Sequence, residues 1–430
     1  MEPTSGGRYR IDPDEALRLV LEAVGAPRSE RASLSEAHGR VLAEEIRADR
    51  DYPPFPRAMM DGYAVRVAQA GTAVEVVGEL SAGRPAIELP GVGQCLEIMT
   101  GAPCPPGTEA VVPKEQVQRE GNRVILPEGI AAGEHIAPQG SECAAGSVVL
   151  RPGQLMTSLG VAVLAAFGRE TVEVTRRPSL AVITTGAELV RPGREPGPGQ
   201  IRDCNGPMLA ALARQMGIEP LLLHAMDDVE AISHALDRAA AKDFVLLTGG
   251  ISAGKFDLVP EALKRYGAEF IFRQVTQRPG KPFLLARKGA QLLFGLPGNP
   301  LACHLVFHRY VAAAIRRSEG KSSAAALLIG QLAAPIRNQG DRTHFLLARA
   351  EQKRGQNDFP APLARQPFEN TRENSSAPFF TAWRVHPLHA ASSADIFTPA
   401  GANCYLRIPP ETVHIAAGEP IVFEWIGDIA

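Results

Sequence analysis

Two apolar runs that each end in Thr and Gly constrain this chain more strongly than any other feature. The run LAVI stops at TTG (184–186), and the run FVLL stops at TGG (248–250). Continuously apolar runs of this length indicate strands of a parallel sheet that is covered on both faces. Glycine after a strand lets the backbone approach a ligand, and the next helix offers its first amides to an anion. Open doubly wound sheets bind ligands at the carboxyl ends of their strands, so we expect the site there.

Strand and helix patterns alternate from residue 178 to about residue 320, which is typical of a doubly wound α/β domain. The expected strands are 180–184, 219–224, 244–248, 269–275 and 291–295. The expected helices are 207–216, 229–241, 258–266 and 300–319.

The rest of the chain predicts further domains, as the length of 430 residues favours. Amphipathic helices are expected at 12–24 and 33–46, and a further helix within 147–177. We expect 1–46 and 147–177 to form one helical domain, with a small β domain of residues 47–146 inserted in it. Residues 321–430 predict a separate small β-barrel or sandwich.

Charge and composition exclude several classes of partner. The net charge of −2 creates no field that would attract nucleic acid or an anionic membrane. No apolar run is long enough to span a bilayer, and the first residues lack an apolar signal core. The six cysteines are dispersed without a CxxC pair, which indicates reduced thiols. We therefore expect a soluble, cytoplasmic protein.

The segment TGGISAGKFD (248–257) is the strongest local signal for a ligand. Its glycines, together with Ser252, predict a nest of amides and a hydroxyl suited to an oxyanion. It is neither GxGxxG nor a P-loop, so neither dinucleotide binding nor ordinary nucleoside triphosphate binding is supported. Asp257 at its end is a candidate magnesium ligand.

Other charged residues near the turns each allow two interpretations. Glu188 either compensates a helix dipole or holds a metal ion. Arg278 and Lys281 share the turn RPGKP, as a surface pair or as an anion clamp. Asp61 precedes Gly62, which is a common turn dipeptide, but the carboxylate would also suit metal or water binding. Asn299 and Pro300 predict the start of a helix.

Taken in order, these motifs resemble the molybdopterin molybdenumtransferases, the family of MoeA and the gephyrin E domain. The motifs are MMDGYAV, MTGAP with AVVPKE, RRPSLAVITTGAEL, GQIRDCN, TGGISAGKFD, RPGKP and GLPGNP. The resemblance runs from the N-terminal helices to about residue 320 and then weakens. It implies a homodimer of four-domain subunits whose α/β domain is of the MoaB/Mog type. It also implies an active site between the α/β domain of one subunit and the inserted β domain of the other.

The chemistry that the resemblance implies is the transfer of molybdenum from molybdate into adenylylated molybdopterin, with Mg²⁺ and with release of AMP. Molybdenum enzymes, or other proteins of cofactor biosynthesis, are further implied partners. The implied catalytic groups are the acids Asp61, Glu142, Glu188, Asp228 and Asp257, of which Asp61, Glu188 and Asp257 would hold the metal ion. The implied substrate-binding residues are Thr100, Thr184, Thr185, Gly186, Asp203, Asn205, Thr248, Gly249, Gly250, Ser252, Pro297, Gly298 and Asn299. The implied molybdate-binding residues are Arg278, Lys281, Arg342 and Ser393.

Four departures from the family pattern keep alternatives open. Ala137 and Pro138 stand where an arginine is common, and Glu142 stands where an aspartate is expected. Ala302 follows PGNPL where a serine is frequent, and Arg278 replaces a lysine. A catalytically altered relative that binds the pterin, the cofactor or a partner protein is one alternative, and an enzyme that handles tungstate is another. An unrelated phosphate-ester enzyme that uses the same nest and carboxylates is a third.

Overall fold

The computed structural model describes residues 10–250, 258–324, 327–338, 340–352 and 383–426 of the chain. The chain forms two compact units, one of Met1–Ser29 with Thr175–Ala430 and the other of Glu30–Val174. In the parts that are described, no helix combines the length and the apolar character needed to cross a membrane.

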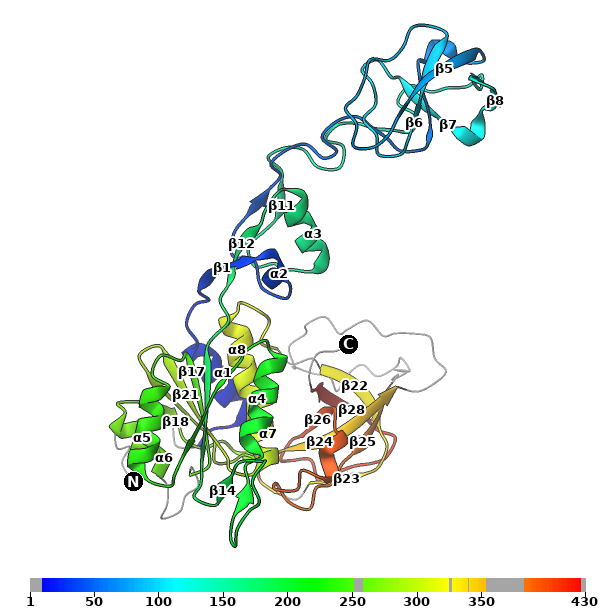
Figure 1. Ribbon diagram of the computed structural model, residues 1–430. Helices are drawn as coiled ribbons and strands as arrows, with labels where there is room; N and C mark the ends of the chain where they lie inside the picture. Colours follow the sequence, from blue (N-terminus) through cyan, green and yellow to red (C-terminus); the bar gives the residue numbers. More distant parts are fainter. Residues whose placement is uncertain (1–9, 251–257, 325–326, 339, 353–382, 427–430) are drawn as a thin grey trace. The chain divides into compact units, whose positions relative to one another are not determined.

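A six-stranded sheet forms the centre of the first unit, in the order β16-β13-β17-β21-β20-β18 (Figure 1). Its strands are β13 (Leu180–Thr185), β16 (Leu221–Ala225), β17 (Phe244–Thr248), β18 (Glu269–Phe272), β20 (Leu284–Lys288) and β21 (Gln291–Leu296). β16, β13, β17 and β21 are parallel, whereas β20 is antiparallel to β21 and β18 is antiparallel to β20. The predicted α/β fold is confirmed. The sequence did not predict β20, because its run LLARK is short and ends in two polar residues. Antiparallel pairing with β21 places it in the sheet.

Helices cover both faces of this sheet (Figure 1). One face carries α1 (Pro13–Ala23), α4 (Asn205–Gln215), α7 (Pro300–Val306), the π-helical turn η3 (Phe307–Val311) and α8 (Ala312–Ser318); the other carries α5 (Val229–Arg238) and α6 (Leu258–Arg265). Leu180 and Val182 of β13 pack in the core of the first face, and Ala181 and Ile183 in the core of the second. All four are fully buried, which is the reason for the continuous apolar pattern.

The N-terminal helix α1 belongs to this unit rather than to the helical segment with which it was grouped above. Asp12 accepts hydrogen bonds from the amides of Asp14 and Glu15 and so caps the helix. Ala16 and Val20 on its apolar stripe are fully buried in the core against the sheet. The stripe predicts that a face is buried, but it does not identify the surface that covers it.

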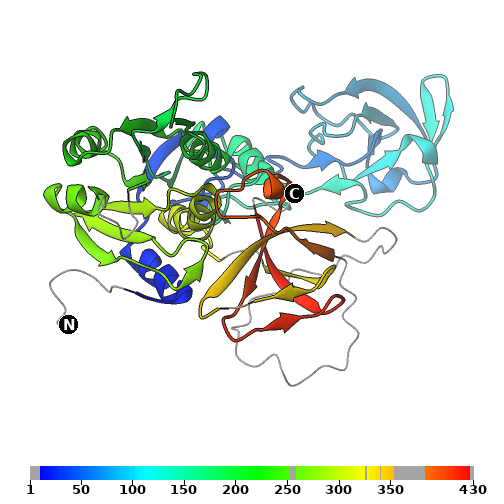
Figure 2. The same ribbon diagram turned by 90° about the horizontal axis from the view of Figure 1, so that it is seen from below.

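The C-terminal strands of the same unit close into a barrel, drawn in orange to red in Figure 2. They are β22 (Leu327–Leu332), β24 (Thr343–Gln352), β25 (Trp383–Pro387), β26 (Cys404–Ile408) and β28 (Pro420–Trp425). Their order is β24-β25-β22-β28-β26, and β26 pairs back with β24. Of the two expected alternatives, the barrel is therefore correct. β19 (Gln277–Arg278) pairs with β24, β23 (Ile336–Arg337) pairs with β27 (His414–Ile415), and η4 is Thr398–Gly401.

In the second unit the helix predicted at 33–46 is wrong beyond its first turn. α2 (Leu34–Ala37) starts at a capping box of Ser33 and Glu36 and ends before Gly39, whose φ is +74°. The chain then continues as extended backbone, in which Val41 bridges Leu155 and Leu42 bridges Val174. The remaining elements here are β1 (Ser29–Ser33), β2 (Ile46–Arg47), β11 (Val148–Leu150), α3 (Ser158–Ala166) and β12 (Thr171–Thr175).

A second six-stranded sheet, in the order β7-β4-β6-β5-β9-β8, makes up most of residues 57–137. Its strands are β4 (Gly62–Val65), β5 (Ala73–Leu80), β6 (Gln94–Ile98), β7 (Ala110–Pro113), β8 (Gln118–Glu120) and β9 (Arg123–Ile125). Beside it lie β3 (Arg57–Ala58) paired with β10 (Ile136–Ala137), and the short helices η1 (Val67–Gln69) and η2 (Lys114–Gln116). The boundaries of four domains stay a prediction.

Candidate functional site

The carboxyl ends of β13 and β17 lie next to one another, where the Thr-Gly turns predict a site. Thr184 and Thr248 are direct partners in the parallel register. Asn205, at the start of α4, donates from Nδ2 to Thr248 Oγ1 at 3.1 Å and to the Gly298 carbonyl at 2.7 Å. The Thr248 hydroxyl in turn donates to the Pro297 carbonyl at 3.1 Å. Predicted residues from three separate turns therefore meet at one edge of the sheet.

Glycine is required at Gly249 by both space and conformation. Its φ is +97°, and a Cβ built there would lie 2.6 Å from the Thr185 carbonyl oxygen. At Gly186 a Cβ would lie 2.7 Å from Oε2 of Glu188, which is a movable side chain, so the φ of +150° is the stronger reason for glycine there. At Gly249 the close approach of the two turns therefore leaves no room for a side chain.

Two of the predicted acids at this edge hold turns. Asp203 accepts from the Gly206 amide at 2.9 Å, and Asp228 accepts from the Ala231 amide at 2.7 Å and caps α5. Asp227, which the sequence reasoning missed, accepts from the Ala187 amide at 2.9 Å and supports the turn after β13. β14 (Leu189–Val190) and β15 (Ile201–Arg202) pair just beyond this turn.

Glu188 is the predicted acid of this edge that is available to a ligand. It is exposed, and its carboxylate has no hydrogen-bond or ion-pair partner among the residues described. Ser252 and Asp257 lie outside the described residues. Among those that are described, no group of three or more His, Cys, Asp or Glu gathers as metal ligands. Magnesium takes one or two carboxylates together with substrate phosphates, so the chemistry of Glu188 fits it.

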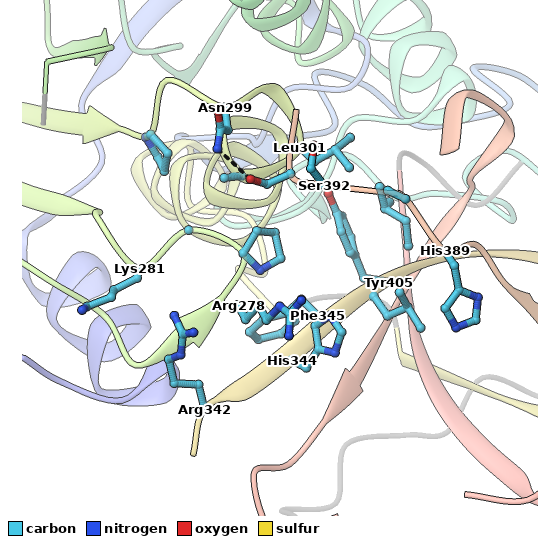
Figure 3. Close-up of a pocket in the computed structure, with 18 of the residues that line it drawn as sticks. Arg278, Lys281, Asn299, Leu301, Arg342, His344, Phe345, His389, Ser392 and Tyr405 are labelled. Carbon is cyan, nitrogen blue, oxygen red and sulfur yellow. Dashed lines mark hydrogen bonds between the residues drawn. The ribbon is translucent and has the colours of Figure 1, made fainter. Parts of the chain in front are cut away.

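A cavity of about 750 Å³ lies between the α/β domain and the barrel of the first unit (Figure 3). Arg278, Lys281 and Arg342, three of the predicted anion-binding residues, line it together. Arg337, His344 and His389 also line it, and none of the described lining residues is acidic. The positive charge of these lining residues suits the cavity to an anion.

Ser393 and Asn299 complete one side of the cavity. Asn299 is the N-cap residue of α7 by position, but its side chain does not cap the helix. It donates instead to Ser393 Oγ at 2.7 Å, the dashed bond in Figure 3. The Leu301 amide also donates to the Ser393 carbonyl at 3.1 Å. Ala302, the small residue of this turn, lines the cavity beside them.

The charges in this cavity act on one another. Arg278 of β19 and His344 of β24 are direct partners in the register. Burial first, and then Arg278, His389 and Arg342, lower the pKa of His344 to about 4. Arg342 Nε lies 3.8 Å from the carboxylate of Asp341, which is highly exposed. Arg337, His344 and His389 were not predicted, because they lie beyond residue 320 and belong to none of the sequence motifs.

The other predicted residues belong to the second unit. Asp61 Oδ1 accepts from both the amide and the hydroxyl of Thr100, each at 2.7 Å, and these bonds lower the pKa of the Asp61 carboxyl. Glu142 pairs with Arg57 at 2.7 Å. Arg57 is also the register partner of Ala137. A guanidinium therefore lies beside the segment in which the expected arginine is missing.

Both compact units contain residues that match models of known protein families. Residues 11–168 match the family model of the MoeA N-terminal region (domain I and II), and residues 181–317 match that of a probable molybdopterin binding domain. A molybdopterin molybdenumtransferase of Synechocystis is 32% identical over 396 residues, which cover 90% of this chain and 92% of that protein. One of Staphylococcus epidermidis is 36% identical over 325 residues, covering 73% of this chain and 77% of that protein.

The chain belongs to the molybdopterin molybdenumtransferase (MoeA) family. Two solved structures of molybdopterin biosynthesis MoeA proteins from Pyrococcus horikoshii support the same fold. One has a TM-score of 0.77 at 25% identity and covers 96% of this chain and 98% of that one. The other has a TM-score of 0.73 at 28% identity and covers 97% of this chain and 100% of that one. The similarity to MoeA therefore extends through the C-terminal barrel, where the sequence motifs weaken.

Proposed function

We propose that this chain transfers molybdenum from molybdate into adenylylated molybdopterin and releases AMP, as a transferase of molybdenum cofactor biosynthesis. The observation that carries this proposal is the cavity lined by Arg278, Lys281 and Arg342 without an acidic residue among the described ones. A tetrahedral dianion needs several charge-assisted hydrogen bonds, and guanidinium groups supply them in pairs. The Ser393 hydroxyl, oriented by Asn299, adds a further polar contact.

The pterin and its phosphate are proposed to bind along the edge of the sheet next to α4 and α7. The proposed contacts are Thr184, Thr185, Gly186, Asp203, Asn205, Thr248, Gly249, Gly250, Ser252, Pro297, Gly298 and Asn299. The hydrogen bonds that join Asn205, Thr248 and Pro297 support this assignment, because they hold three turns in one rigid arrangement. Exposed amides at such turns are suited to phosphate oxygens.

We further propose a magnesium ion that is held by Glu188, Asp257 and Asp61 together with substrate phosphates. When bound, it would neutralise the charge that develops on the phosphate during cleavage. Asp61 is ionised at neutral pH, as an ordinary aspartate is, and the bonds from Thr100 lower its pKa further. Both of these bonds reach Oδ1, so Oδ2 is available to accept a proton from a water molecule. Thr100 is proposed to support Asp61, Glu142 to hold Arg57 beside the same segment, and Asp228 to position the turn before α5.

The proposal also includes a cytoplasmic homodimer that passes its product to cofactor-biosynthesis proteins or molybdenum enzymes. Family membership supports a dimer, in which the acids of the β domain would serve a site of the second copy. Light scattering tests this directly, because the dimer has twice the 45.9 kDa mass of the chain.

Release of AMP tests the proposed reaction. The purified chain, adenylylated molybdopterin, Mg²⁺ and molybdate should release AMP well above a control without enzyme, and tungstate in place of molybdate tests the choice of metal. Asp61→Asn should lower the rate at least about a hundredfold, the usual size of a general acid–base contribution. An absence of AMP release by the wild type would refute the proposal. Equal release by the wild type and an Asp61→Asn, Asp257→Asn double variant would favour a binding module instead.

A further inference from the structure

We propose that His344 is a further ligand of the anion held in this cavity, and that it takes up a proton when the anion binds. The inference deepens the proposed function and rests on its oxyanion site. His344 is not one of the residues that the family resemblance implies.

The position of His344 gives it access to the same anion as the predicted cations. It lies two residues after Arg342, and its backbone pairs with that of Arg278. The half-buried imidazole lines the cavity, and it has no hydrogen-bond partner among the described residues. Figure 3 shows it with Arg278 and Arg342 in one group of side chains. An anion that contacts both guanidinium groups therefore lies within reach of this ring.

Without a ligand, the surroundings keep His344 neutral. The charged or titratable groups that act on it are Arg278 from β19, Arg342 just before β24 and His389 from the segment after β25. Lys281 and Arg337 add positive charge to the same cavity. These groups and burial lower the pKa of His344 to about 4, so the ring is uncharged near neutral pH. No carboxylate among the described lining residues opposes this effect.

A bound dianion offsets the positive field of these cations at the ring. Opposite charge at hydrogen-bond distance favours the protonated form of histidine and raises its pKa. The imidazolium then donates from both ring nitrogens, whereas the neutral ring donates from one. Because binding is reciprocal, a proton that the anion attracts must also tighten the binding of the anion. The anion and the proton thus bind together.

Calorimetric titration of the full chain with molybdate measures anion binding and proton uptake separately. The heat is compared in two buffers of different ionisation enthalpy at about pH 6.5, and the affinity is followed from about pH 8 to about pH 6. We expect uptake of a fraction of a proton for each anion, up to one. The affinity should rise as the pH falls, by up to about tenfold per pH unit, which is the limit for one linked proton.

His344→Gln should bind molybdate more weakly, with a smaller change of affinity with pH and with less proton uptake. His344→Arg should bind it without proton uptake at this position, because the charge is permanent. His234→Gln is the matched control, since His234 is an exposed residue of α5 that does not line the cavity. Circular dichroism establishes that each variant folds. If His344→Gln does not fold, the histidine ring resonances of the wild type with and without molybdate report the same change of pKa.

The two proposals fail in different ways. If the wild type binds no molybdate, the proposed oxyanion site is wrong. If it binds molybdate without proton uptake, or if His344→Gln takes up as many protons as the wild type, the inference about His344 is wrong. Proton uptake by the oxyanion itself would be the same in the wild type and in every variant, which distinguishes it from proton uptake by His344.

Discussion

Arg309 and Glu424 form a buried ion pair, with Arg309 Nη1 donating to Glu424 Oε1 at 2.6 Å. The two residues are 8% and 5% exposed. Arg309 lies in η3, on the helical run of the α/β domain, and Glu424 lies in β28 of the barrel. Arg309 also donates to Asp14 of α1 at 2.9 Å. One guanidinium therefore joins three segments that are far apart in the sequence, and it ties together the two domains between which the anion cavity lies.

Replacing Arg309 by Met should lower the free energy of unfolding by about 3–5 kcal/mol, because Glu424 is then left buried and unpaired. The double variant Arg309→Met, Glu424→Leu should recover part of this loss, since no unpaired charge is left. Urea unfolding followed by circular dichroism measures both. Arg214→Ala, which breaks the exposed pair Arg214–Glu219, is the control and should leave the midpoint unchanged. Equal midpoints for Arg309→Met and the wild type would contradict the role of the pair.

Replacing Arg278 by Ala should weaken molybdate binding about tenfold to a hundredfold, the range expected when a hydrogen bond to a charged group is lost. Calorimetric titration at constant ionic strength measures the change. Arg349→Ala serves as control, because Arg349 is an exposed arginine of β24 that pairs with Glu351 and does not line the cavity. If both variants bind molybdate equally well, the cavity is not the oxyanion site.

Replacing Gly249 by Ala should destabilise the site and abolish AMP release. The methyl group would meet the Thr185 carbonyl at 2.6 Å, on a backbone whose φ of +97° is strained for alanine. The cost is about 1–3 kcal/mol, which is typical of a residue forced into such a conformation. Thermal unfolding and the AMP assay test this. Gly193→Ala is a control in the same unit, since a Cβ there would meet no atom within 4 Å and Gly193 is not a proposed contact. An active Gly249→Ala protein of normal stability would refute the requirement.

Acid should destabilise the first unit through two half-buried histidines. Burial lowers the pKa of His304 to about 4, and burial with the neighbouring His304, Arg316 and Arg309 lowers that of His308 to about 3. The ordinary pKa of 6.5 applies to the unfolded chain, so the unfolded chain binds protons that the folded chain excludes. Their contribution to the free energy of unfolding is therefore complete above about pH 6.5, and it is lost as the pH falls towards about 4. By pH 5 each histidine costs about 2 kcal/mol.

Urea midpoints at pH 7 and pH 5 check this dependence. His308→Phe should lose part of the difference between the two midpoints, whereas His234→Gln, which changes an exposed histidine, should retain all of it. A wild type with the same midpoint at both pH values would contradict the expectation.

By itself, the sequence determined the elements whose signals are local. The apolar run of Phe244–Thr248 predicted β17 to the residue, because a strand buried on both faces has no polar position. The Thr-Gly turns follow β13 and β17 as predicted, because only glycine fits at positions such as Gly249; a ligand site at this edge stays a prediction. The ordered motifs were sufficient to indicate the family.

Tertiary structure alone decided the features that depend on contacts between distant segments. The pattern of 33–46 favoured a helix, but only Leu34–Ala37 is helical, and bridges from Val41 and Leu42 to Leu155 and Val174 hold the following residues as extended backbone. The stripe of α1 did not show which core it joins. The pairing of β19 with β24 likewise brings His344 next to Arg278, which lies 66 positions earlier in the sequence. Periodicity records which faces are buried within a segment, whereas the partner of each face is set by packing across the whole chain.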